Sequence, residues 1–128
     1  MFIDHILNNL KLNKEEFLFQ FRSHPDYPSI LAFSDTLNFM GIKNDAYEID
    51  KADWHDLPER FITQYKNNFA LVEMQNINNY KLYTDKTEVI NNEQLYHNSS
   101  NFVMLLEKTD QIQEINKINF NRLLYLLF

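Results

Sequence analysis

The hydrophobic pattern of this chain changes at Gly41, its single glycine, and that change limits the folds available to it. Before Gly41, apolar residues recur every three or four positions, which is the spacing typical of amphipathic helices. After it, short apolar runs alternate with turns rich in Asn and Asp, which indicates successive strands. The sequence therefore predicts an α+β fold in which N-terminal helices pack on a C-terminal antiparallel sheet.

Three helices are expected before Gly41, separated by recognisable stops. Asn13 can cap the second helix, and the two prolines in the segment His24–Ser29 favour a turn before the third. Gly41 suits the end of that third helix because it adopts the left-handed conformation freely. The third helix is expected to turn these residues inward: Ile30, Leu31, Phe33, Leu37, Phe39 and Met40.

Short strands with brief helical turns between them are expected in the second half of the chain. The pattern assigns no element to residues 59–67. The expected strands are 44–49, 68–75, 79–84, 88–90 and 101–107, and the expected helical turns are 53–57 and 91–96.

Composition excludes several classes of function. The net charge of −6 repels phosphate backbones, so nucleic acid is not expected as a partner. The chain has no cysteine, which removes disulfides, thiolate metal sites and thiol nucleophiles together. One glycine cannot build a glycine-rich phosphate loop.

Candidate metal and catalytic groups are scattered along the sequence. The four histidines form no metal-ligand spacing, so no metal or cofactor is expected. Two serines lack the context of a hydrolase nucleophile, and two carboxylate pairs are interpreted as helix starts. These residues are His5, His24, His55 and His97; Ser29 and Ser34; Glu15 with Glu16 and Asp53 with Asp56.

The chain divides into a domain of residues 1–108 and a segment of residues 109–128. Residues 110–119 are polar and are interpreted as a linker, and the last six residues are all apolar or aromatic. Two interpretations of that apolar run stay open. It is either an element that docks on the core or the first turns of a transmembrane helix, which needs about 20 residues to span a bilayer.

Several segments of the chain together resemble one known family, the double-glycine leader peptidase domain of bacterial peptide-exporting ABC transporters. The resemblance covers roughly residues 1–108 and implies a papain-like cysteine-peptidase fold. The segments that carry it are Pro28–Leu31 leading to Phe39–Ile42, Leu57-Pro58 with Phe69–Val72, Tyr80–Asp85, Glu93–Tyr96 and Phe102–Leu106.

The departures from that family concern its catalytic residues. The resemblance places the nucleophilic cysteine at the first helix, where this chain opens with Met1-Phe2-Ile3-Asp4. It places the catalytic histidine immediately before the apolar strand, where this chain has Asn67-Asn68. Asp85, or Thr84 beside it, matches the orienting aspartate. Thiol proteolysis needs a thiolate, a base and an orienting group, so Asn68 and Asp85 are interpreted as degenerate active-site positions.

Five aromatic residues are the candidates for binding a peptide. Aromatic rings with a polar tip supply contact area at little entropic cost, and an edge strand can pair with a guest backbone. The alternative is that each ring packs in the core. The candidates are Tyr27, Trp54, Tyr65, Tyr80 and Tyr83.

The expected function is a non-catalytic, peptidase-like domain that binds or docks a polypeptide. The ligand is an export substrate, a leader peptide or a segment of the domain's own membrane protein. The segment His24–Ser29 also resembles the N-terminal domain of certain membrane proteins of the vitamin K epoxide reductase family, which offers a structural or regulatory role instead. Either context puts the domain on the cytoplasmic side of the inner membrane, and the isolated domain is expected to be a monomer. A stand-alone enzyme with carboxylate chemistry has no positive support in the sequence.

Overall fold

The computed structural model describes residues 2–106 and 121–122, and it confirms the α+β fold. The predicted linker and apolar segment of residues 109–128 lie outside the described residues, apart from a short strand at 121–122. No helix in the described part of the chain is long and apolar enough to cross a membrane. The elements are α1 Phe2–Leu10, α2 Lys14–Ser23, α3 Ile30–Phe39, β1 Asn44–Glu48, the 3-10 helix η1 Lys51–Asp56, β2 Arg60–Tyr65, β3 Asn68–Met74, β4 Asn79–Tyr83, β5 Thr87–Asn91, α4 Asn92–Asn98, β6 Ser99–Leu106 and β7 Asn121–Arg122.

Local side-chain bonds fix the ends of the helices. The Asn13 side chain accepts a hydrogen bond of 2.9 Å from the Glu16 N–H at the start of α2, as predicted. Ser29 caps α3 in the same way by accepting from the Ala32 N–H at 3.1 Å. The chain leaves α3 through Gly41, whose φ of +88° favours glycine. The predicted helix boundaries are therefore confirmed.

The turn between α2 and α3 is held by His24. Its Nε2 donates to the Asp35 carboxylate at 2.8 Å, while its Nδ1 accepts from the Asp26 N–H at 3.0 Å. The following Tyr27–Pro28 peptide bond is cis. Both ring nitrogens of His24 are thus engaged in fixing the turn.

One predicted core residue of α3 is wrong. Phe39 is 68% exposed, whereas Phe33 and Leu37 are buried. Two residues after Leu37, Phe39 is rotated about 200° around the helix and therefore lies on the opposite face.

The sheet contains a central strand that the sequence pattern missed. Its strand order is β5-β4-β3-β2-β6-β1-β7, and all neighbours are antiparallel. β2 pairs with β3 through a two-residue turn in which Lys66 and Asn67 both have positive φ, 49° and 68°. That geometry is a type I′ turn, which usually carries glycine, so a glycine-free Lys-Asn pair gives little signal in the sequence.

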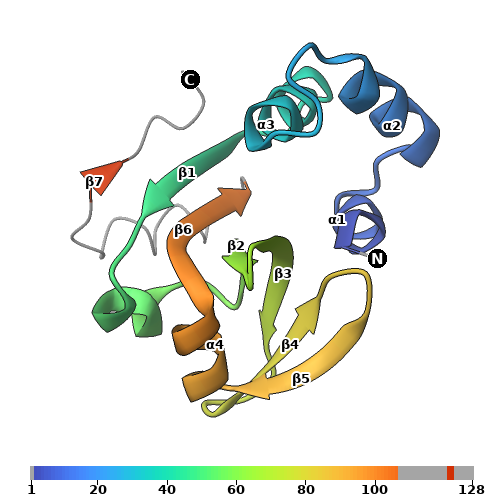
Figure 1. The fold of residues 1–128 in the computed structure, drawn as a ribbon. Coiled ribbons are helices and arrows are strands. Elements are labelled where there is room, and N and C mark those ends of the chain that lie inside the picture. The colour runs from blue at the N-terminus through green and yellow to red at the C-terminus, as the bar shows by residue number, and fades with distance from the viewer. Residues whose placement is uncertain (1, 107–120, 123–128) are drawn as a thin grey trace.

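Each face of the sheet buries its own apolar cluster. The helices α1, α2 and α3 cover one face, and η1 with α4 covers the other (Figure 1). On the first face, Ile62 and Leu71 pack with Phe17 of α2 and Phe33 of α3. This arrangement brings α1 onto β3 and places its N-terminal end beside the turn between β4 and β5.

Candidate functional site

A surface pocket lies where the N-terminal end of α1 meets the start of β3 and the end of β4. Its volume is about 390 Å³, which falls within the usual range for ligand-binding pockets. Half of its lining is apolar and half is polar. The residues of this α1–β3–β4 pocket are Phe2, Ile3, Asn68, Phe69, Thr84 and Asp85.

The two predicted degenerate positions, Asn68 and Asp85, come together in this pocket. Asn68 is the first residue of β3, directly after the type I′ turn, and its side-chain amide reaches the Lys66 carbonyl only weakly, at 3.5 Å. Asp85 lies in the turn after β4, 17 positions further along the chain. Two hairpin turns therefore deliver both side chains to one place.

The turn that carries Asp85 is tied to its neighbours. The Thr84 hydroxyl lies 3.1 Å from the Asp85 carboxylate and donates to it, and the Thr84 N–H donates to the Lys86 carbonyl at 2.9 Å. The Asp85 side chain is exposed and keeps acceptor capacity for a ligand. The pocket thus offers an amide, a hydroxyl and a carboxylate beside three apolar side chains.

The pocket holds one titratable side chain, Asp85, among the residues that line it. The nearest imidazole along α1 is His5, which stacks on Tyr83 with ring centroids 3.9 Å apart. Burial lowers the pKa of His5 below its ordinary value, and that ring does not line the pocket. The Asn68 amide does not titrate near neutral pH, so it can donate and accept hydrogen bonds but cannot act as a general base.

The five aromatic candidates do not form one surface. Trp54, Tyr65, Tyr80 and Tyr83 are between 3% and 8% exposed and belong to the two core clusters. Only Tyr27 of the five is open to solvent, at 44%, and it packs edge-on against Phe21. In this structure the other four rings stabilise the core and leave little area for a ligand.

Trp54 illustrates that structural role. Its Nε1–H donates to the Ile49 carbonyl at 2.8 Å, and the Lys51 ammonium lies 4.5 Å from the centre of its ring. Lys51 itself donates to three oxygens at the start of β6, and its pKa is lowered by burial. Burial also shifts the pKa of Tyr80, which it raises to about 12, so the Tyr80 hydroxyl stays neutral.

Four residues of the pocket, Phe2, Ile3, Phe69 and Thr84, were not predicted as binding residues. The sequence showed Phe2 and Ile3 as the opening of the first helix and Phe69 as part of the apolar strand. It gave Thr84 as the alternative to Asp85 for the orienting position. No pattern in the sequence places them together, because Phe2 on α1 and Phe69 on β3 are 67 positions apart in the chain. In the described part of the chain, no three His, Asp or Glu side chains converge as a metal site requires.

Comparison with solved structures shows which fold this is. The peptidase domain of Streptococcus ComA, a bi-functional ABC transporter involved in a quorum sensing pathway, matches with a TM-score of 0.64 and 13% identity over 81% of this chain and 85% of that one. A double-glycine motif protease from an AMS/PCAT transporter, in complex with the leader peptide, matches with a TM-score of 0.68 and 12% identity over 81% and 79%. Neither a protein-family model nor a curated protein matches the chain. The domain therefore has the papain-like α+β fold of double-glycine peptidase domains.

Proposed function

We propose that this domain docks an extended polypeptide at the α1–β3–β4 pocket without cleaving it. The observation that carries the proposal is the convergence of Phe2, Asn68 and Asp85 in a pocket of about 390 Å³. In the resembled family, the first helix, the start of the apolar strand and the end of the next strand supply the catalytic residues. One of the solved structures with this fold holds a leader peptide, which supports a polypeptide as the ligand class.

The chemistry of the pocket suits a peptide main chain beside one apolar or small side chain. Phe2, Ile3 and Phe69 supply apolar surface, whose burial is the main favourable term in binding. Asn68 can both donate to a carbonyl and accept from an N–H, and Asp85 accepts from N–H groups or a cationic side chain. In an otherwise apolar pocket, a few polar groups of this kind fix the orientation of a bound ligand.

The absence of catalysis is part of the proposal. The chain contains no cysteine. The resemblance to the family puts Asn68 where the family has its base. Asp85 without a thiol and an imidazole has nothing to orient. The residues present can bind and orient a peptide, but they supply neither a nucleophile nor a base to activate one.

The proposed context is a membrane protein, with this domain on the cytoplasmic side of the inner membrane. In a peptide exporter the ligand is a leader peptide or an export substrate. The alternative, a structural or regulatory domain of a vitamin K epoxide reductase-type thiol oxidoreductase, rests on the resemblance of the His24–Ser29 segment.

A binding assay with charge-matched variants tests the proposal. A fluorescently labelled double-glycine leader peptide is titrated with the wild-type chain, with Asp85→Lys and with Glu93→Lys, and mass spectrometry follows the peptide. Glu93 is exposed on α4, which covers the opposite face of the sheet, so it controls for net charge. We expect Asp85→Lys to weaken binding at least about tenfold, Glu93→Lys to change it less than about twofold, and the peptide to stay intact.

Two outcomes contradict the proposal. Equal loss of affinity in both variants makes the interaction a general charge effect rather than docking in the pocket. Cleavage of the peptide by the pure chain, abolished by a substitution in the pocket, makes the domain an enzyme.

A further inference from the structure

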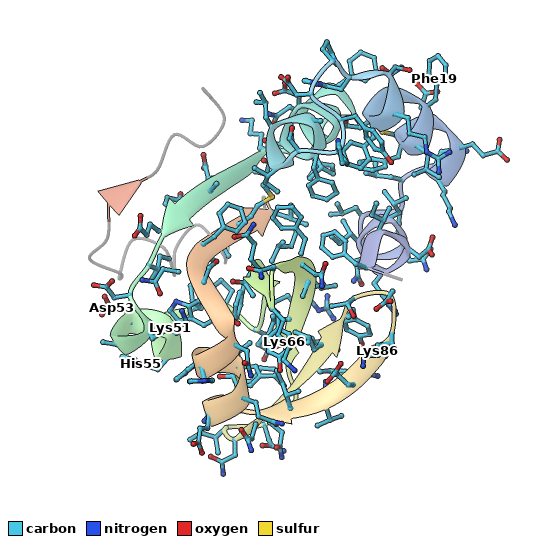
Figure 2. The ribbon with its side chains drawn as sticks, viewed as in Figure 1. Phe19, Lys51, Asp53, His55, Lys66 and Lys86 are labelled. Atoms are coloured by element: carbon cyan, nitrogen blue, oxygen red, sulfur yellow. The ribbon has the colours of Figure 1, made fainter. Side chains whose placement is uncertain are left out.

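A second surface, on α2, carries an acidic residue at one end, a basic residue at the other and apolar residues between them. The outer face of this helix carries Glu15, Leu18, Phe19 and Arg22, and these residues with Ser23 line a shallow hollow of about 390 Å³. Phe19 is 65% exposed and points away from the rest of the molecule (Figure 2). The buried residues of α2, Phe17 and Phe21, lie on its opposite face.

The two charged residues at the ends of this face are available for a partner. Glu15 and Arg22 are exposed, and neither forms an ion pair among the described residues. They stand seven positions apart, about two helical turns or 10 Å, on the same face. The apolar pair Leu18 and Phe19 lies midway between them.

We propose that this α2 face binds the same face of a second copy of this chain, with the two helices antiparallel. A two-fold axis passing between Leu18 and Phe19 places Glu15 opposite Arg22 of the second copy, and Arg22 opposite its Glu15. The same axis places Leu18 opposite Phe19 of the second copy. A two-fold interface requires such a self-complementary surface: if one residue of the first copy contacts a second residue of the other copy, the reverse contact is made as well.

The charges at this face disfavour another occupant, an anionic membrane. The neighbouring pair Glu15-Glu16 opposes anionic lipid, although Phe19 alone would suit an apolar surface, whereas the net charge of −6 repels a second copy as well and does not discriminate between the two. A second copy supplies an opposite charge to both ends of the face, Arg22 to Glu15 and Glu15 to Arg22.

The contact is small, which determines its strength. Two ten-residue helices bury less area than the roughly 1,200 Å² of stable interfaces, so the expected dissociation constant is on the order of 0.1–1 mM. A dilute solution of the chain is then monomeric, as expected from the sequence. The α2 face shares no residue with the α1–β3–β4 pocket, so pairing leaves that pocket open in both copies.

Charge reversal and charge exchange test this arrangement on the full chain. Sedimentation equilibrium is measured up to about 1 mM for the wild type, Glu15→Arg, Arg22→Glu and the double variant carrying both changes. Each single reversal turns two attractive contacts of the symmetric pair into two repulsive ones, so we expect the dissociation constant to rise at least about tenfold. The double variant restores both contacts with exchanged signs and should return to within about threefold of the wild type.

Phe19→Ser should also weaken association, whereas Ile77→Ser, at a position 81% exposed elsewhere on the surface, should not. Circular dichroism confirms that each variant is folded. A wild type that stays monomeric at 1 mM overturns the proposal. So does a double variant as weak as the single ones, and so does association that is lost equally in Ile77→Ser.

Discussion

Replacing Trp54 by Phe separates a core role for this residue from the peptide-binding role that its sequence context suggests. Trp54 is 3% exposed, donates to the Ile49 carbonyl, and packs edge-on against Phe61 and Tyr96. Phenylalanine keeps a ring in place but removes the donor and part of the volume. The substitution should therefore destabilise the fold and leave peptide affinity unchanged within about twofold.

The magnitude follows from two terms. A buried carbonyl left without its donor costs about 1–3 kcal/mol. The smaller ring leaves a void of roughly 40 Å³, which at about 24 cal/mol per Å³ adds about 1 kcal/mol. The free energy of unfolding should fall by about 3 kcal/mol, which is a large fraction of the stability of a domain of this size.

Urea unfolding followed by far-UV circular dichroism measures this loss. Fluorescence is unsuitable because Trp54 is the single tryptophan of the chain. With a denaturant slope near 2 kcal/mol per M, the midpoint should fall by about 1.5 M at an unchanged slope. A Tyr27→Phe control, on a ring that is 44% exposed, should shift stability by less than about 0.5 kcal/mol. A Trp54→Phe variant as stable as the wild type, with weakened peptide binding, would falsify the core assignment.

Three further predictions concern local structure. Gly41→Ala should lower the free energy of unfolding by about 1–2 kcal/mol, because a φ of +88° strains any side chain, even though no atom lies within 4 Å of an added Cβ. An unchanged melting temperature would contradict the left-handed conformation. Asn13→Ala should cost about 1 kcal/mol and Asn13→Ser much less, since serine can still cap the Glu16 N–H; equal losses would argue against capping. Burial holds the pKa of His5 below its ordinary value, so the unfolded chain takes up a proton that the fold does not. Stability should therefore be kept above about pH 6.5 and decline as the pH falls through that value, and His5→Gln should flatten this decline in urea unfolding at two pH values.

The sequence predicted the helical half of the fold better than the sheet. Asn13, Ser29 and Gly41 mark helix ends through bonds and backbone angles that are local, so they are visible along the chain. β2 escaped because both of its faces are largely buried, which removes the alternation of polar and apolar residues, and because its turn has no glycine. Tertiary contacts, which the sequence pattern does not encode, determine that this strand is central.

The candidate site was predicted in part. The resemblance to a family predicted Asn68 and Asp85 as site residues, and the structure places both in one pocket. The aromatic candidates were chosen for residue type alone, and burial depends on which face of a strand each ring occupies. The sequence therefore does not distinguish Trp54 and Tyr80, which are buried, from Tyr27, which is exposed.

The most direct test of polypeptide docking is a nitrogen-15 NMR titration of the chain with a double-glycine leader peptide, compared with an unrelated unfolded peptide. We expect saturable shifts for the leader peptide that cluster at Ile3, Asn68, Phe69 and Asp85, with the peptide intact at the end. Shifts that are absent at millimolar peptide, or that are the same for both peptides and scattered over the surface, would contradict it.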